Sequence, residues 1–320
     1  MSAREPTAHR HEIVVVGSGF PGLAQVLELR RAGVDDVVVL EEADGLGGAG
    51  RGRTPEVRAA LEQLADDHDL RRHVHVGREV TGARWDEESR TWTVATRDGD
   101  VWVCHFLVAG LGARHLPDVS GPADTRLAGL DIVGRDGRTL RGTWADHGVA
   151  THLGITVSDF PNLFLLLGTP AGTDTGPGRH LAALVIRSQT RYVRQAITTV
   201  RRTGMSGLDV RAEVQQRSNA AVRRRLGKGV LARGGHLGVA GTIRPGAAVR
   251  YWLRTRRFDP EDFELFGRAA DAARAEPDDG GRVSRTTAAD QALLHDGGDE
   301  DAVAPVEPSA REAAPPSGVG

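Results

Sequence analysis

A glycine-rich turn near the N-terminus constrains the fold of this chain more than any other sequence feature. Residues 17–22 read Gly-Ser-Gly-Phe-Pro-Gly, which is the pattern G-x-G-x-x-G. The apolar, β-branched run Ile13–Val16 precedes this turn, and Leu23–Ala32 follows it with apolar residues at helical spacing, ended by Gly33. A second apolar run, Val37–Leu40, comes next. This order predicts a βαβ unit whose two strands are parallel neighbours.

The same turn predicts a dinucleotide site. Gly17 permits the tight turn, Gly19 lets the backbone approach a pyrophosphate, and Gly22 lets helix and strand pack closely. The N-terminus of the helix offers unpaired N–H groups and a positive dipole end to that pyrophosphate. Glu41 ends the second strand, where an acid can accept hydrogen bonds from the ribose of FAD or NAD and disfavours the 2′-phosphate of NADP. A glycine-rich turn without a ligand is the alternative.

The remaining sequence predicts an α/β fold with a small β-meander and a disordered C-terminal tail. Asp98-Gly99 lies between two strand-like runs and predicts a hairpin turn. From about Gly267 onward, large apolar residues are almost absent, which predicts the disordered tail. The expected strands are Val74–Val80, Trp92–Thr96, Trp102–Val108 and Phe164–Leu167, and the expected helices are Glu56–Leu70, His180–Arg202 and Glu213–Leu226.

Composition disfavours several other kinds of site. The single cysteine, Cys104, excludes a disulfide framework and is expected to be a buried apolar residue. The 12 histidines form no ligand pair with carboxylates at helical spacing, and His73 and His75 are expected on a solvated strand face, so no metal site is predicted. The arginines of Arg211–Arg257 are expected on a solvated helix and not on nucleic acid.

The chain shows no targeting or membrane segment. Residues 1–11 are polar and lack the basic, apolar and small-residue regions of a signal peptide. The longest apolar run, Leu163–Leu167, is far shorter than the roughly 20 residues that span a bilayer. The expectation is a cytoplasmic protein without membrane contact.

A family resemblance extends over most of the chain up to Phe266. His11–Gly48, with the residues Val15–Phe20, Val38–Glu41 and Gly47-Gly48, resembles the N-terminal FAD-binding segment of Baeyer-Villiger and related flavin-containing monooxygenases. Further stretches look like the rest of the first FAD segment and like the second FAD segment: His73–Trp92, Phe106–Gly121, Gly134–Gly168 and Ser188–Tyr192.

This resemblance implies a Rossmann-like FAD-binding domain and an FAD-dependent oxidoreductase of the monooxygenase type, acting on a small molecule such as a ketone. It names no catalytic residue. The implied cofactor-binding residues are Gly17, Ser18, Gly19, Phe20, Gly22, Glu41, Gly47, Gly48 and Val80. The implied organisation is residues 10–122 as the first FAD-binding segment, 123–205 as the second segment with a long C-terminal helix, 206–266 as a covering region and 267–320 as a disordered acidic tail.

The chain departs from the family pattern in ways that bear on catalysis. Family members carry an NADPH-binding domain between the two FAD segments, whereas here Pro117–Gly121 runs almost directly into Leu130–Gly134. The family's alanine-threonine-glycine motif is present only as Gly110-Leu111-Gly112. NADPH is expected for the family, but this sequence contains no domain to bind it, so a separate reductase could be the electron source. A degenerate, non-catalytic FAD-binding or interaction protein is the alternative.

Overall fold

The computed structural model describes residues 7–47, 55–110, 130–145, 149–166, 177–226 and 245–268. The chain divides into the units Met1–Arg282 and Val283–Gly320, and all of the described residues lie in the first. Gly48 and the expected tail from residue 269 onward lie outside the described part. The start expected for the tail is too early, because Gly267 and Arg268 still belong to a strand.

The predicted βαβ unit is present. Strand β1 (Ala8–Val16) leads through the glycine turn into α1 (Phe20–Arg30), and β2 (Val37–Leu40) follows. The two strands are parallel, with Ile13 beside Val37 and Val16 beside Leu40. The glycine turn therefore lies at the carboxyl ends of two neighbouring parallel strands.

The described residues form an eight-stranded sheet in the order β3-β2-β1-β6-β5-β4-β7, with β8 paired to β6. The further strands are β3 (Val74–His75), β4 (Val80–Asp86), β5 (Thr91–Thr96), β6 (Val101–Ala109), β7 (Asp131–Val133) and β8 (Leu163–Leu165). Pairing is antiparallel in β4–β5 and β5–β6 and parallel in the other pairs. The predicted parallel sheet and β-meander are therefore both present.

Strand β6 connects the two parts of the sheet. Its N-terminal half pairs with β5, and its C-terminal half pairs with β8, where Leu107 lies beside Leu163 and Ala109 beside Leu165. Since β8 comes from a much later part of the chain, the parallel sheet is assembled from two separate chain segments, as the sequence predicted.

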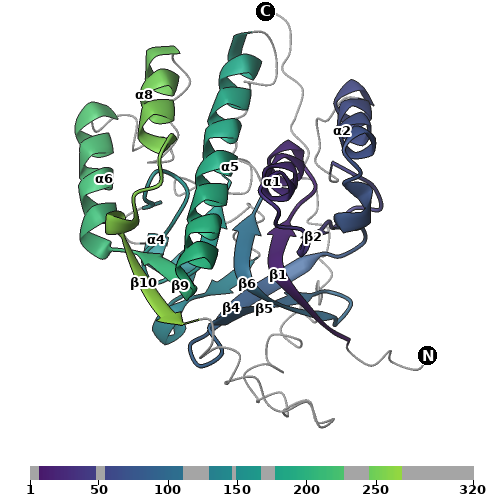
Figure 1. The fold of residues 1–320 in the computed structure, drawn as a ribbon, viewed down its shortest axis with the longest axis horizontal. Coiled ribbons are helices and arrows are strands. Elements are labelled where there is room, and N and C mark those ends of the chain that lie inside the picture. Colours follow the sequence, from purple (N-terminus) through teal and green to yellow (C-terminus); the bar gives the residue numbers. More distant parts are fainter. Residues whose placement is uncertain are drawn as a thin grey trace, which may run out of the picture. The chain divides into compact units, whose positions relative to one another are not determined.

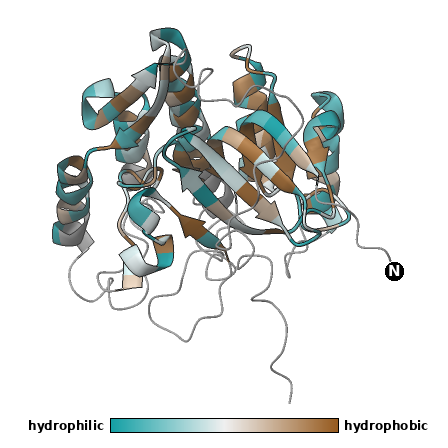
Figure 2. Cartoon of the chain, turned by 90° about the horizontal axis from the view of Figure 1, so that it is seen from below, coloured by the Kyte–Doolittle hydropathy of each residue, from teal (hydrophilic) through white to brown (hydrophobic). Residues whose placement is uncertain are grey.

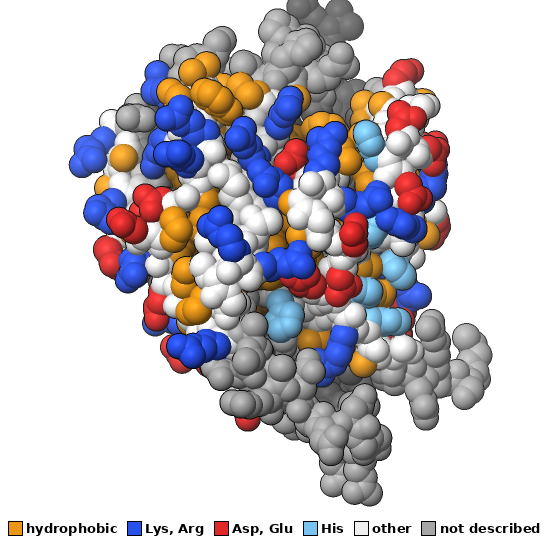
Figure 3. All heavy atoms as spheres, viewed as in Figure 1, with side chains coloured by type: hydrophobic (Ala, Val, Ile, Leu, Met, Phe, Trp, Pro, Cys, Tyr) orange, Lys and Arg blue, Asp and Glu red, His pale blue; other side chains and the backbone are white. Residues whose placement is uncertain are grey.

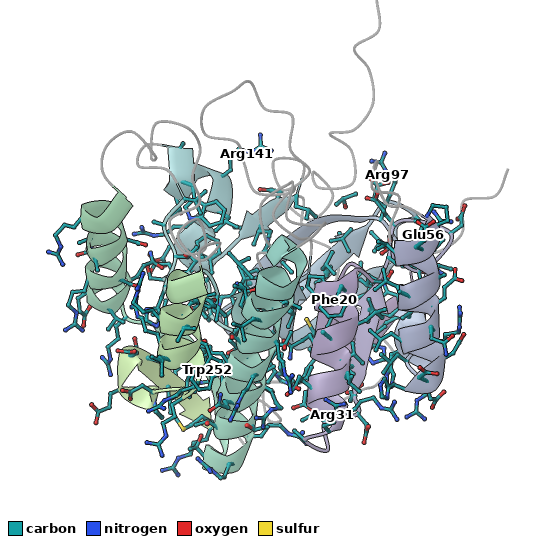
Figure 4. All side chains as sticks on the ribbon, turned by 90° about the horizontal axis from the view of Figure 1, so that it is seen from above. Phe20, Arg31, Glu56, Arg97, Arg141 and Trp252 are labelled. Carbon is teal, nitrogen blue, oxygen red and sulfur yellow. The ribbon has the colours of Figure 1, made fainter. Side chains whose placement is uncertain are left out.

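Five helices lie in one layer on one face of the sheet, in the order α6, α8, α5, α1 and α2 (Figures 1 and 4). Their bounds, besides α1, are α2 (Pro55–Asp67), α5 (Pro177–Thr203), α6 (Ala212–Leu226) and α8 (Pro245–Thr255). Shorter elements are α4 (Leu140–Ala145) and the 3-10 turns η1 (Arg71–His73), η3 (Arg135–Gly137) and η4 (Pro260–Asp262). A separate antiparallel pair joins β9 (Met205–Val210) to β10 (Phe263–Arg268).

The core consists of two apolar clusters. The first joins strand residues such as Val15 to Leu23 of α1 and Val193 of α5, and the second contains three tryptophans of the meander, Trp85, Trp92 and Trp102. Figure 2 shows the hydrophobic residues concentrated on the strands. Cys104 is buried in the second cluster, which confirms the expectation for it.

The structure corrects two expectations about the segment after α2. Val74–Val80 is not one strand, because Gly77 adopts φ +66 and separates β3 from β4. His73 is not on a solvated face: it is buried in η1, with its Nδ1 2.9 Å from the carbonyl oxygen of Val37. The sequence also did not predict β7, α8, β9 or β10. Among the helices described here, none combines the length and apolarity needed to cross a membrane.

Candidate dinucleotide site

The glycine turn is held by close backbone contacts that only glycine permits. Gly17 adopts φ +94, which L side chains rarely adopt, and its N–H donates to the Leu40 carbonyl at 2.8 Å. A Cβ on Gly22 would lie 2.0 Å from the carbonyl oxygen of Gly17. The structure therefore confirms the prediction that Gly22 lets helix α1 pack closely on strand β1.

Gly110 is a further glycine of this arrangement, which the sequence analysis named only as part of a degenerate motif. It follows β6 directly, and its N–H donates to the Val16 carbonyl at 2.8 Å. A Cβ on Gly110 would lie 3.1 Å from that carbonyl oxygen and 3.2 Å from the Cα of Gly22. The carboxyl ends of β1 and β6 thus meet the start of α1 through backbone contacts alone.

The N-terminus of α1 is suited to an anion. Gly19 is the N-cap residue, no side chain caps the helix, and no acidic residue stands in its first turn. Pro21 has no N–H to satisfy. The positive end of the helix dipole is therefore not compensated by the helix's own side chains. Phe20, which is labelled in Figure 4, begins the helix and is 42% exposed.

Glu41 and Ser18 connect the turn to the end of β2. The Glu41 carboxylate is buried, and its Oε2 accepts hydrogen bonds from Ser18 N at 2.8 Å and from Ser18 Oγ at 2.7 Å. Its Oε1 accepts from Ala43 N at 3.0 Å. Ser18 Oγ in turn accepts from Gly47 N at 2.8 Å. One carboxylate and one hydroxyl therefore join the glycine turn to both ends of the loop after β2.

Val80 follows a segment that is hydrogen-bonded to the loop after β2. Val80 is the first residue of β4 and is partly buried against the second core cluster. Two residues earlier, Arg78 N donates to the Glu41 carbonyl at 2.7 Å, and Gly77 N donates to the Ala43 carbonyl at 3.0 Å. Of the predicted residues, Gly17, Ser18, Gly19, Phe20, Gly22, Glu41, Gly47 and Val80 are described, and Gly48 is not.

Away from the glycine turn, His152 and Asp209 are among the buried groups whose pKa values are shifted. Burial lowers the pKa of His152 to about 4, with a smaller effect from the Arg254 charge. Burial raises the pKa of Asp209 on β9 to about 7, an effect that the Arg135 guanidinium opposes. Within the described ranges, no group of histidine, cysteine and acidic residues has the geometry of a metal site.

The described parts of the arginine-rich region Arg211–Arg257 include α6 and α8 of the helical layer. Lys and Arg side chains are spread over this face of the molecule (Figure 3). Arg250 and Arg254 of α8 are exposed, as expected for a solvated helix, and Arg194 of α5 pairs with Glu28 of α1 at 3.2 Å.

Known relatives match this chain over part of its length, whereas no protein-family model matches it. A Baeyer-Villiger monooxygenase of Pseudomonas aeruginosa is 35% identical over 142 residues, which cover 42% of this chain and 26% of that protein. Another Baeyer-Villiger monooxygenase, of Streptomyces coelicolor, is 31% identical over 153 residues, covering 37% of this chain and 29% of that protein. Over the matched residues the chain is similar to Baeyer-Villiger monooxygenases. It spans about a quarter of the length of the relatives it matches.

Solved monooxygenase structures share the fold. An oxidized steroid monooxygenase bound to NADP has a TM-score of 0.61 at 17% identity, and the match covers 80% of this chain and 99% of that one. The closed structure of cyclohexanone monooxygenase also has a TM-score of 0.61, at 13% identity, covering 81% and 99%. At these identities the likeness to the two solved structures concerns the fold alone.

Proposed function

We propose that this chain binds FAD at the glycine turn and is an FAD-dependent oxidoreductase of the Baeyer-Villiger type, reduced in size. The observation that carries the proposal is the backbone packing of Gly17, Gly22 and Gly110 at the start of an uncapped helix. A Cβ on Gly22 or Gly110 would collide with neighbouring backbone, and Gly17 needs a positive φ, so these glycines hold the turn in the conformation that a Rossmann-type pyrophosphate site requires. The sequence relatives, which are Baeyer-Villiger monooxygenases, support the same cofactor class.

Different residues of the turn and its surroundings would contact different parts of FAD. The first turn of α1, from Gly19 to Gly22, offers N–H groups and a positive dipole end to the pyrophosphate. Glu41 accepts a hydrogen bond from the adenosine ribose, and Phe20, Gly47, Gly48 and Val80 complete the expected contacts. When bound, FAD supplies the redox chemistry, and the protein supplies orientation and exclusion of water.

The link between β6 and β7 limits which reactions the chain can support. Residues 110–130 alone connect the two strands, and a domain needs at least about 50 residues. A nicotinamide-binding domain does not fit into this link, so electrons would come from a separate reductase or from the substrate. We propose a ketone as the substrate class, because the sequence relatives are Baeyer-Villiger monooxygenases. A non-catalytic FAD-binding protein is the second candidate, because the same short link removes the reductive half of the reaction.

The test is cofactor binding followed by turnover. Full-length protein is purified, released flavin is identified by chromatography, and FAD is titrated into flavin-free protein while flavin fluorescence is recorded. Saturable binding of FAD is expected. Protein that neither retains nor binds FAD contradicts the proposal. Photoreduction of the bound flavin, followed by aerobic incubation with ketones, separates the two candidates, since only an enzyme yields an oxygenated product.

A further inference from the structure

The hydrogen bonds of Ser18 and Glu41 limit how the ribose can be recognised, an inference that rests on the proposed binding of FAD. We propose that Ser18 leaves the Glu41 carboxylate a single free acceptor position, so that this chain recognises one hydroxyl of the adenosine ribose and not both. Ser18 is in this role a positioning residue, because it acts on the cofactor through Glu41.

The limit follows from a count of acceptor positions. A carboxylate has about four, two on each oxygen. Both positions of Oε2 are used by Ser18, through N at 2.8 Å and Oγ at 2.7 Å. One position of Oε1 is used by Ala43 N at 3.0 Å. Within the part of the chain that the structure describes, one position on Oε1 remains for a ligand.

Ser18 cannot easily release its position on Oε2. A hydroxyl has one proton, and Gly47 N donates to Ser18 Oγ at 2.8 Å, so the proton of Ser18 is directed to Glu41. The Ser18 side chain is fully buried, where an unpaired hydroxyl is costly. A ribose hydroxyl that competed for this position would leave the Ser18 proton without an acceptor.

Removal of the Ser18 hydroxyl should change the recognition pattern and not only its strength. In Ser18→Ala, the backbone N–H groups of residue 18 and Ala43 still hold the carboxylate in place. One position on Oε2 becomes free, and a second ribose hydroxyl can then donate to it. A purely structural role for Ser18 would weaken the binding of all FAD analogues by the same factor.

The experiment compares FAD with two analogues whose adenosine ribose lacks either the 2′- or the 3′-hydroxyl, titrated into flavin-free full-length protein by fluorescence. For the natural chain, one analogue should bind about ten- to a hundred-fold more weakly than FAD and the other as FAD does. For Ser18→Ala, both analogues should bind more weakly than FAD. Ser18→Thr keeps the hydroxyl and should retain the natural pattern. Thr255→Val removes a buried hydroxyl on α8 that donates to the Tyr251 carbonyl, and serves as the control.

Each result with the natural chain decides the matter. If both analogues bind more weakly than FAD, or neither does, Glu41 does not recognise one hydroxyl and the inference is wrong. An unchanged pattern in folded Ser18→Ala also contradicts it. If FAD itself does not bind to the natural chain, the proposed function fails, which is a different outcome.

Discussion

Ser18 donates two hydrogen bonds to one oxygen of Glu41, from N at 2.8 Å and from Oγ at 2.7 Å. The contact joins the glycine turn after β1 to the end of β2, two elements that parallel pairing already brings together. Because both residues are buried, these bonds are poorly replaced by water. The geometry of the turn and the position of the carboxylate are therefore coupled.

Glu41→Ala should lower both FAD affinity and stability. It removes an acceptor from Ser18 N, Ser18 Oγ and Ala43 N, and a lost hydrogen bond to a charged group costs about 1.5 to 3 kcal/mol. FAD binding should weaken tens-fold or more, measured by fluorescence titration. Glu88→Ala, in the exposed turn between β4 and β5, is the control and should change neither quantity. Unaltered FAD affinity in Glu41→Ala would show that the Glu41 carboxylate does not contact FAD.

Gly22→Ala should distort the turn. Its Cβ would lie 2.0 Å from the Gly17 carbonyl oxygen, so the backbone of one residue must move. Overpacking of this kind costs about 1 to 3 kcal/mol, and each kcal/mol lowers Tm by roughly 2 to 4 °C in a domain of this size. Thermal melts and FAD titration measure the effect. Gly45→Ala is the matched control, because its Cβ would meet no atom within 4 Å. Equal Tm values for the two variants would contradict the close contact.

The sequence predicted the parts of the fold that local pattern determines. The βαβ unit followed from β-branched runs around a G-x-G-x-x-G turn, and the hairpin at Asp98-Gly99 followed from a turn type that needs positive φ, which Gly99 adopts at +87. In contrast, β9 and β10 pair residues more than fifty positions apart, such as Phe263 with Val210, and neither strand alternates clearly. A local sequence pattern does not predict long-range pairing of this kind.

The glycine geometry of the turn was predictable from the sequence, and the hydrogen bonds around it were not. The motif gave Gly17, Gly22 and Glu41, because each is required by a fixed backbone geometry. Ser18 donates to Glu41 from both N and Oγ, and this arrangement depends on the path of the loop at Ala43. The spacing of residues in the sequence does not predict that path. Gly110 was missed as a packing residue because it is close to Gly22 only in three dimensions.

The stability of the protein should vary with pH because of Asp209. Burial raises the pKa of this carboxyl from its ordinary value of 3.8 to about 7. Since the folded state binds the proton more tightly than the unfolded state, the favourable contribution is fully present below pH 4 and is lost as the pH rises to about 7. Asp209→Asn, which carries no charge, should therefore gain stability relative to the natural chain as the pH increases over this range.

The measurement for Asp209 is the difference in Tm between Asp209→Asn and the natural chain from pH 5 to pH 8. Burial lowers the pKa of His152 to about 4, so the stability that neutral His152 contributes is lost as the pH falls below the ordinary pKa of 6.5. This effect is the same in both proteins and cancels in the difference. The difference should increase with pH and level off above about 7. A difference that stays constant would show that Asp209 is charged throughout this range, and a difference that decreases would also contradict a raised pKa.

The last prediction concerns what the chain cannot do unaided: FAD-loaded protein should not be reduced by NADPH at a rate typical of Baeyer-Villiger monooxygenases. In the described residues, one glycine turn stands between parallel strands, and Glu41 at its side disfavours a 2′-phosphate. Residues 110–130 are too few for a second dinucleotide domain. Without one, the proximity contribution to hydride transfer, roughly 7 to 11 kcal/mol, is largely lost.

Anaerobic mixing of FAD-loaded protein with NADPH tests this, with flavin absorbance followed in time. Slow bleaching that rises linearly with NADPH concentration is expected, because hydride transfer would then be a bimolecular encounter with no binding step. Dithionite is the control, since it reduces accessible flavin without a binding site. Fast bleaching that saturates with NADPH would instead demonstrate a nicotinamide site, and the full monooxygenase reaction would then be open to this chain without a separate reductase.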